Sequence, residues 1–206
     1  MTKIFAHRGA SAYAPENTME AFELAAKQGA DGIELDVHVT KDGEVVVTHD
    51  EKIDRVSNGS GFIKDMTLRE LKRLSFHNHM ESYVGAGIPT LREVLEYVST
   101  TNMDVNIELK TGIYWYPQIE EKTAFIVQET GMHDRVIYSS FNHHSIAKIK
   151  EIDSTAETAW LFSDVILNVE QYAKANGVEG LHPAVYHMYM SDFMKRWNES
   201  GEKVRV

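Results

Sequence analysis

Residues 32–50, GIELDVHVTKDGEVVVTHD, decide how this chain is interpreted. Two β-type runs meet at Asp42-Gly43, a dipeptide typical of a two-residue hairpin turn. Such a turn places Asp36 directly opposite His49, and strand alternation puts Glu34 on the same face as Asp36. Neighbouring carboxylates repel each other, so this face indicates a bound cation or a shared proton. The alternation by itself also fits a solvated hairpin with an exposed polar face.

Composition narrows the class of protein. The chain has 206 residues, of which 43% are hydrophobic and 25% charged, and this predicts one globular domain over residues 1–206. A net charge of −10 disfavours nucleic acid or an anionic membrane as the main partner. The absence of cysteine excludes disulfides and thiolate zinc sites. No apolar stretch has the length of a signal peptide or membrane span, so we expect a cytoplasmic protein.

Short apolar runs and amphipathic segments flank the hairpin. Residues 4–6 predict a buried strand, and Asn17 is expected to cap a helix, with Glu20 completing a capping box and Gly29 ending the run. Residues 50–87 are polar and rich in glycine. We interpret them as an insertion within the domain.

From Thr90 onward, capped helices alternate regularly with strands. The predicted strands cover residues 104–109, 136–140, 158–162, 178–182 and 204–206, and the predicted helices cover residues 91–98, 117–129, 142–152, 169–175 and 192–198. This alternation predicts a parallel sheet covered by helices. The most economical architecture is an irregular (β/α)8 barrel of the triosephosphate isomerase type, with the hairpin and a small insertion after the second strand.

The strand count falls short of a closed barrel. With residues 44–49 as an antiparallel return strand, seven parallel strands are predicted, and the last has only begun at Val206. An open barrel exposes two strand edges, which proteins usually avoid or cover. Either a C-terminal helix and strand are missing, or a second subunit closes the gap in a homo-oligomer, or the count is short by one.

Polar side chains gather where the predicted parallel strands end. They are His7 and Arg8 after the first strand, Glu34 and Asp36 in the second, Asn106, Glu108 and Lys110 in the third, and His49 in the hairpin. In barrels of this type the C-terminal ends of the strands form the active site. Strands distant in the sequence therefore place similar groups at one end of the barrel.

These residue types suggest metal-assisted acid–base chemistry. The carboxylates of Glu34, Asp36 and Glu108 form a set of hard oxygen ligands, which suits Mg²⁺ or Ca²⁺ better than zinc. His7 and His49 suit general acid and base roles, because imidazole titrates near neutral pH.

Fixed positive charge beside the carboxylates points to the substrate. Arg8 and Lys110 are expected at this end of the barrel in an otherwise acidic protein. Such charge next to a divalent cation favours an anionic substrate, most simply a phosphate. A metal, two imidazoles and two cationic side chains are sufficient to cleave a phosphodiester.

A series of motifs then resembles one known family. The motifs are His7-Arg8-Gly9, Pro15-Glu16-Asn17-Thr18, Glu34-Leu35-Asp36-Val37, Lys41-Asp42-Gly43, Thr48-His49-Asp50, Ser57-Asn58-Gly59 and Ile107-Glu108-Leu109-Lys110, with Ser139-Ser140-Phe141 and Leu181-His182-Pro183 in the second half. In this order they resemble the glycerophosphodiester phosphodiesterase family. The family usually continues its seventh strand into a Trp-Thr-Val-Asn-like run, then a helix and an eighth strand, whereas this sequence ends at Val206.

The resemblance implies an activity and a role for each matching residue. The activity is hydrolysis of a small-molecule glycerophosphodiester to glycerol 3-phosphate and an alcohol. The implied metal ligands are Glu34, Asp36 and Glu108, the implied acid and base are His7 and His49, and the implied phosphate-binding residues are Arg8 and Lys110.

Four residues near this set have more than one interpretation. Trp115 and Phe141 either wall the pocket against the substrate or pack against their neighbours. His182 is expected to line the pocket. Asp50 serves its loop or orients a histidine.

Two alternative functions remain open at this point. A phospholipase of the same broad superfamily would cleave intact lipid, but the acidic charge and the lack of an amphipathic membrane-docking segment disfavour it. A chain without an eighth strand could instead bind phosphodiesters without turning them over.

Overall fold

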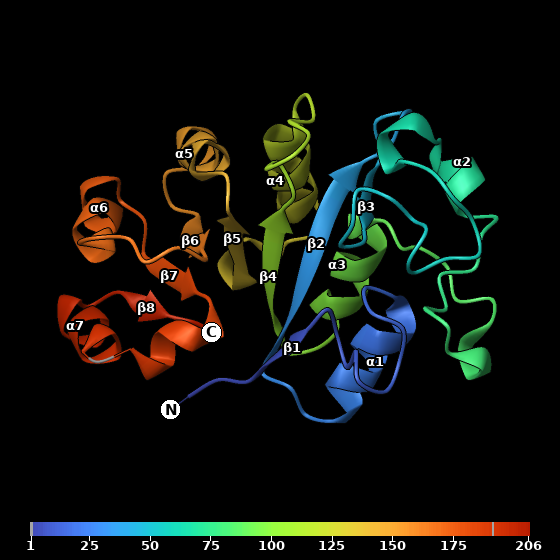
Figure 1. The fold of residues 1–206 in the computed structure, drawn as a ribbon. Helices are drawn as coiled ribbons and strands as arrows, with labels where there is room; N and C mark the ends of the chain where they lie inside the picture. Colours follow the sequence, from blue (N-terminus) through green and yellow to red (C-terminus); the bar gives the residue numbers. More distant parts are fainter. Residues whose placement is uncertain (1, 191) are drawn as a thin grey trace.

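The computed structural model describes residues 2–190 and 192–206. Seven parallel strands form one sheet in the order β1-β2-β4-β5-β6-β7-β8, and β3 pairs antiparallel with β2 (Figure 1). The strands are β1 (Phe5–His7), β2 (Gly32–Val39), β3 (Val45–Val47), β4 (Asp104–Leu109), β5 (Val136–Ser140), β6 (Glu157–Phe162), β7 (Gly180–Pro183) and β8 (Lys203–Val204). The predicted count of seven parallel strands is therefore confirmed for the described residues.

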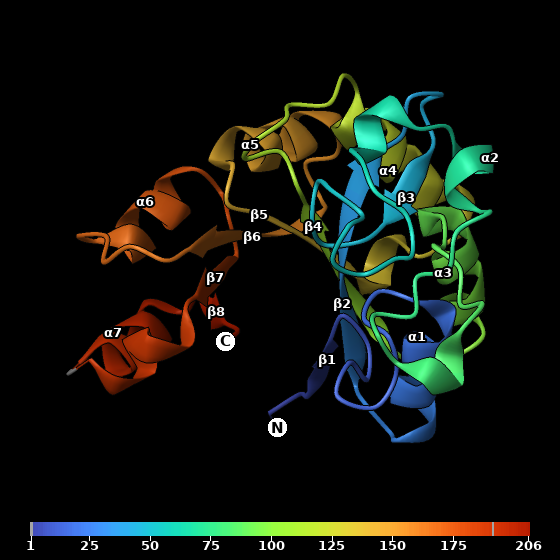
Figure 2. The same cartoon turned by 45° about the vertical axis from the view of Figure 1, so that its right-hand side comes forward.

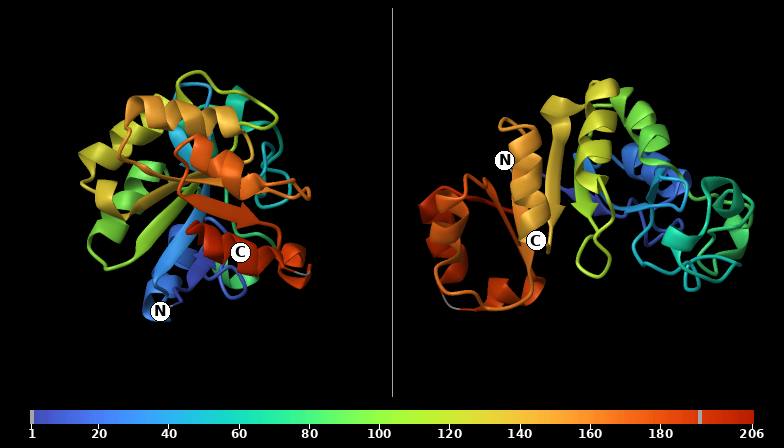
Figure 3. Two further views of the ribbon diagram at one scale, coloured as in Figure 1. Left: turned by 90° about the vertical axis from the view of Figure 1, so that its left-hand side faces the viewer. Right: turned by 90° about the horizontal axis from the view of Figure 1, so that it is seen from above.

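The sheet curls, and its helices cover the outer side of the curl (Figures 2 and 3). The α-helices are α1 (Met19–Lys27), α2 (Leu68–Leu71), α3 (Leu91–Ser99), α4 (Ile119–Glu129), α5 (His143–Ile152), α6 (Val169–Ala175) and α7 (Phe193–Ser200). Within the described residues β1 pairs only with β2 and β8 only with β7, so the strands form an open barrel of the (β/α)8 type. No helix in the described part of the chain is both long and apolar enough to cross a membrane.

Strand alternation divides β2 between the core and the inside of the curl. Ile33, Leu35 and Val37 are fully buried in the main apolar cluster, together with residues of the covering helices. Each such side chain contributes about 1.5–3 kcal/mol when it leaves water. Glu34 and Asp36 consequently point to the opposite, concave face.

The prediction that Asn17 caps α1 is wrong. The N-cap is Thr18, whose hydroxyl accepts a hydrogen bond from the Ala21 amide. Asn17 instead adopts a left-handed backbone conformation with φ of 57°, and its side-chain amide donates to Asp36 at 2.8 Å. The side chain of Asn17 therefore makes a tertiary hydrogen bond to Asp36 instead of the local cap that its residue type favours.

The hairpin also differs from the prediction, by one residue. Val37 faces Val47, and the Thr40 amide donates to the carbonyl of Glu44, so Asp36 lies opposite Thr48 rather than His49. The loop has three residues, and its last, Gly43, takes a φ of 88°. The cause lies in the side chain of Asp42.

Asp42 accepts hydrogen bonds from one partner within the hairpin and from one partner in α2. Its carboxylate accepts hydrogen bonds from the Thr40 hydroxyl at 2.6 Å and from the Leu68 amide at the start of α2 at 3.0 Å. Asp42 therefore keeps a negative φ, and the left-handed residue that the turn needs is Gly43 alone.

The segment 50–87 packs over β3 with a small apolar cluster of its own. The buried members are Val46, Ile53, Val56, Ile63, Leu71, Phe76 and Ile88. Among them only Val46 belongs to the sheet, so β3 is the strand against which the insertion packs. This packing holds in place the segment that follows β3 and contains His49.

Stability should fall in mild acid because of a buried histidine. His182 on β7 is 5% exposed, and burial, followed by the charge of Arg205, lowers the pKa of His182 to about 3. An unfolded histidine has a pKa near 6.5, so the unfolded chain binds more protons between these values and stability falls as the pH drops through that window. Within that window, this histidine should lower the free energy of unfolding by up to about 1.4 kcal/mol for each pH unit of acidification.

We expect His182→Gln to flatten the change in unfolding free energy between pH 7 and pH 5, measured by urea denaturation at each pH. His79→Gln is the control, because His79 is exposed. If the unfolding free energy changes equally with pH in both variants, His182 is not the group that causes the loss of stability in acid.

Candidate active site

A tight turn after β1 brings His7 and Arg8 to the mouth of the barrel. Arg8 and Gly9 both have positive φ, at 57° and 80°, and the Gly9 amide donates to the carbonyl of Ala6 at 3.0 Å. The Arg8 amide donates to the carboxylate of Glu34 at 3.0 Å. The turn thereby connects the end of β1 directly to β2.

Three carboxylates converge on one point. Asp36 on β2 and Glu108 on β4 are paired neighbours in the parallel ladder, and Glu34 lies two residues before Asp36. One oxygen of each residue lies within 4.8 Å of the oxygens of the other two. The sequence prediction that these side chains come together is therefore confirmed.

Burial makes this cluster unfavourable in the absence of a cation. Burial, and then the charges of Asp36 and Glu108, raise the pKa of Glu34 well above its usual value. Burial and the charge of Asp36 likewise raise the pKa of Glu108. Asp36 Oδ1 is buried and accepts no hydrogen bond within the described residues. An oxygen-only donor set with an unpaired buried oxygen fits a hard divalent cation such as Mg²⁺ or Ca²⁺.

Two cationic side chains lie against the carboxylates. Lys110 Nζ is 2.9 Å from Glu108 Oε1 and 3.7 Å from Asp36 Oδ1. Arg8 Nε is 3.6 Å from Asp36 Oδ2. Burial opposes the charge of Lys110, but the two carboxylates outweigh it and raise the pKa of the ammonium group. The site therefore carries fixed positive charge, as predicted.

His49 reaches the site through a bend rather than through strand pairing. The β3 ladder ends at Val47, and the chain then turns. His49 Nδ1 lies 2.6 Å from Asp50 Oδ1, and Nε2 lies 3.2 Å from Lys110 Nζ. The ring thus directs Nε2 toward the carboxylates, and Asp50 orients it.

An ion-pair network behind His49 contains two residues that the sequence analysis did not identify. Arg55 donates to Asp50 at 2.7 Å and to both oxygens of Glu16, at 2.8 and 2.9 Å. Arg8 donates to the same carboxylate of Glu16 at 3.0 Å. Burial opposes ionisation of Asp50, yet the hydrogen bonds from Arg55 and His49 lower its pKa to about 2.

Asn17 is a third residue that the sequence analysis assigned differently. It is buried, its amide donates to Asp36 Oδ2, and its own Oδ1 has no partner within the described residues. Glu16 and Asn17 both stand in the turn at residues 15–18, which is the signal that could have identified them.

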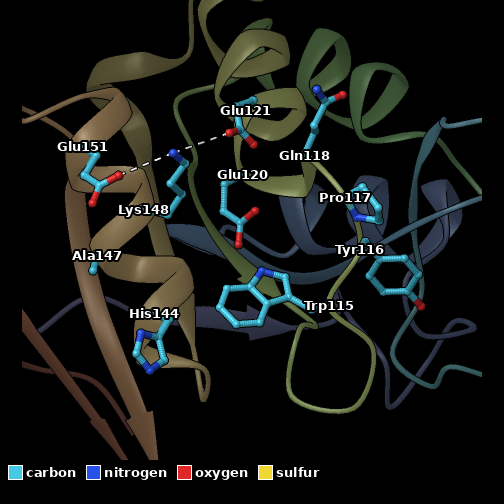
Figure 4. Close-up of a pocket in the computed structure, with 10 residues that line it drawn as sticks. All are labelled: Trp115, Tyr116, Pro117, Gln118, Glu120, Glu121, His144, Ala147, Lys148 and Glu151. Atoms are coloured by element: carbon cyan, nitrogen blue, oxygen red, sulfur yellow. Dashed lines mark hydrogen bonds and ion pairs between the residues drawn. The ribbon is translucent and has the colours of Figure 1, made fainter.

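The structure also places the remaining candidate residues. His7 Nε2 is 3.8 Å from Glu34 Oε2, and its ring is largely exposed. Trp115 is 61% exposed and lines a pocket of about 420 Å³ between α4 and α5 (Figure 4). Phe141 is 51% exposed and is not among the residues lining that pocket. Asn106 is buried with an unpaired Oδ1, and His182 lies against Arg205.

Comparison with known proteins identifies the family. The profile of the "Glycerophosphoryl diester phosphodiesterase family" matches residues 7–206. The chain belongs to this family. It is 44% identical over 204 residues to "Glycerophosphodiester phosphodiesterase" of Caldanaerobacter subterraneus subsp. tengcongensis, covering 98% of this chain and 84% of that protein. It is 48% identical over 187 residues to a protein of the same name from Bacillus altitudinis, covering 90% and 76% respectively.

Solved structures of family members share the fold. A phosphodiesterase from Oleispira antarctica, in complex with the product sn-glycerol-3-phosphate, matches with a TM-score of 0.92 and 28% identity, covering 99% of this chain and 83% of that one. A glycerophosphodiester phosphodiesterase from Agrobacterium tumefaciens matches with a TM-score of 0.86 and 31% identity, covering 99% and 85%. The predicted barrel architecture is confirmed by these likenesses.

The turn at Gly9 should tolerate no side chain. A Cβ atom at Gly9 would lie 2.7 Å from the backbone carbonyl carbon of Ala21, whereas one at Gly29 would meet no atom within 4 Å. Both glycines have a φ near 80°. We expect Gly29→Ala to cost about 1–2 kcal/mol from backbone strain alone. Gly9→Ala should cost a further ~1–3 kcal/mol because of the clash.

The two variants can be compared by urea denaturation at neutral pH. Equal losses of unfolding free energy in Gly9→Ala and Gly29→Ala would contradict the close packing of this turn on α1.

Proposed function

We propose that this chain hydrolyses glycerophosphodiesters to sn-glycerol 3-phosphate and an alcohol, with a divalent cation and two histidines. The observation that carries the proposal is the convergence of three carboxylate oxygens within 4.8 Å of one another beside two cationic side chains. The activities named for the relatives, and the product bound to the Oleispira protein, support it.

In the proposed enzyme, Glu34, Asp36 and Glu108 hold the cation. The bound ion would polarise a phosphoryl oxygen and neutralise charge in the transition state. Mg²⁺ and Ca²⁺ are the proposed ions, because all three ligands are carboxylate oxygens.

Arg8 and Lys110 bind the phosphate in this scheme. The Lys110 ammonium group already lies against Glu108 and Asp36, so it is held beside the place where the substrate anion enters. Arg8 is fixed from behind by Glu16. Both side chains therefore offer charge to the phosphate without a large rearrangement.

His7 and His49 transfer protons at opposite ends of the scissile bond. One ring takes a proton from the attacking oxygen, and the other gives a proton to the oxygen of the departing alcohol. Asp50 holds Nδ1 of His49, which leaves Nε2 for this exchange. Trp115 and Phe141 are proposed to contact the alcohol portion of the substrate, because both rings are exposed.

Chelation and ligand substitution test the metal. We expect EDTA to abolish release of glycerol 3-phosphate from glycerophosphocholine, and Mg²⁺ or Ca²⁺ to restore it. Glu34→Gln and Glu108→Gln should each lower kcat/KM at least about 100-fold, because each removes a ligand and its charge. Glu23→Gln on the exposed surface of α1 is the matched control. Activity that is indifferent to chelation would reject the proposal.

Substitution of the histidines tests proton transfer separately from metal binding. His7→Ala and His49→Ala should each lower kcat by about 10²–10⁴-fold. Calorimetric titration with Mg²⁺ or Ca²⁺ should still detect the ion, because neither ring is a proposed ligand. Exposed His79→Ala should behave like the parent protein. Near-normal turnover in His49→Ala would exclude it from the reaction.

A further inference from the structure

A buried histidine that has no part in the proposed chemistry lies on the same face of β2 as Glu34 and Asp36. His38, on β2, is fully buried. Its Nε2 lies 3.0 Å from the backbone carbonyl oxygen of His49, and its Nδ1 lies 2.9 Å from the hydroxyl of Tyr116. One side chain thus bridges the proposed catalytic histidine and the loop that follows β4.

The chemistry of the partners fixes the direction of both hydrogen bonds. A carbonyl oxygen can only accept, so Nε2 of His38 carries the hydrogen and donates to His49. In the neutral ring Nδ1 is then an acceptor, and the Tyr116 hydroxyl donates to it. Tyr116 is also buried, and its ring meets His38 edge-on, with ring centroids 5.6 Å apart. The two side chains form one ordered relay of hydrogen bonds.

The backbone at His49 lacks the support that a strand provides. The β3 ladder ends at Val47, two residues earlier. Within the described residues, the hydrogen bond to the carbonyl of His49 comes from His38. Asp50 fixes the imidazole of His49 from the side-chain end, so His38 is the complementary restraint at the backbone end.

We propose that His38 and Tyr116 are positioning residues that hold His49 at the distance proton transfer requires. This inference depends on the proposed role of His49 and deepens it. Misplacement of a catalytic group by about 1 Å can cost about 100-fold in rate. The loop that supplies Tyr116 also carries Trp115 into the pocket of Figure 4, so the relay ties this pocket wall to His49.

Four single variants separate positioning from general stability. His38→Leu removes both hydrogen bonds but keeps an apolar side chain of similar size, and His38→Gln retains a donor and an acceptor. Tyr116→Phe removes only the hydroxyl. Tyr114→Phe is the matched control, because Tyr114 lies in the same loop, 6.4 Å from Tyr116 between ring centroids.

Loss of positioning should appear in kcat and not in KM. We expect His38→Leu to lower kcat by about 10–100-fold, with KM and the calorimetric affinity for Mg²⁺ within about twofold of the parent. Tyr116→Phe should lower kcat by about 3–10-fold, because one of the two hydrogen bonds remains. His38→Gln should restore kcat to within about threefold of the parent. Tyr114→Phe should not change it.

A combined variant shows whether His38 acts through His49. In the His49→Ala background, adding His38→Leu should change the residual kcat less than about twofold, since the residue to be positioned is gone. Circular dichroism and thermal unfolding of each variant establish that it is folded. If His38→Leu does not fold, His38→Gln and Tyr116→Phe still carry the test.

Three results would overturn the inference. If His49→Ala lowers kcat by the expected ~10²–10⁴-fold while His38→Leu and Tyr116→Phe retain full kcat, the positioning role is wrong and the proposed function stands. Independent, multiplicative losses in the combined variant would likewise assign His38 a merely structural role. Normal turnover in His49→Ala would instead remove the proposed role of His49 and this inference with it, while the hydrolytic activity and the metal site would stand.

Discussion

The candidate site depends on the repulsion among three carboxylates, two buried and one partly buried, which adjacent strands of one sheet hold close together. Asp36 and Glu108 are ladder neighbours, so they cannot separate without breaking the pairing of β2 and β4. The same strands bury Leu35 and Ile107 completely on their other face. Packing at alternate positions therefore stabilises a backbone whose inner face is electrostatically unfavourable, and a bound cation would relieve that repulsion.

Loops rather than strands supply the compensating charge. Glu16 accepts hydrogen bonds from both Arg8 and Arg55, so a single carboxylate ties the turn after β1 to the segment after β3. Arg55 in turn fixes Asp50, and Asp50 fixes His49. Such paired charges are partly shielded from water, which makes them stronger than isolated surface ion pairs. The geometry of His49, the proposed proton-transfer residue, thus depends on a contact between residues that are 39 positions apart in the sequence.

The sequence predicts the regular elements better than the connections between them. The predicted strands at residues 104–109 and 136–140 and the helix at 169–175 coincide with β4, β5 and α6, because apolar periodicity and turn residues mark them locally. The carboxylate cluster was also predictable, since parallel strands end at one edge. The hairpin register was not, because Asp42 bonds to Leu68, which is 26 residues away. Asn17 was misassigned because the residue types that cap helices also bind carboxylates.

The position of His7 shows how an edge strand can still hold a site residue. β1 has three residues and, within the described chain, pairs on one side only, whereas β2 and β4 each have neighbours on both sides. The ladder alone would restrain His7 less than Glu34. The turn at Arg8 and Gly9 adds what the missing neighbour does not provide, because its amides bond to Glu34 and to Ala6. The left-handed backbone of this turn is therefore as much a part of the site as the side chains it presents.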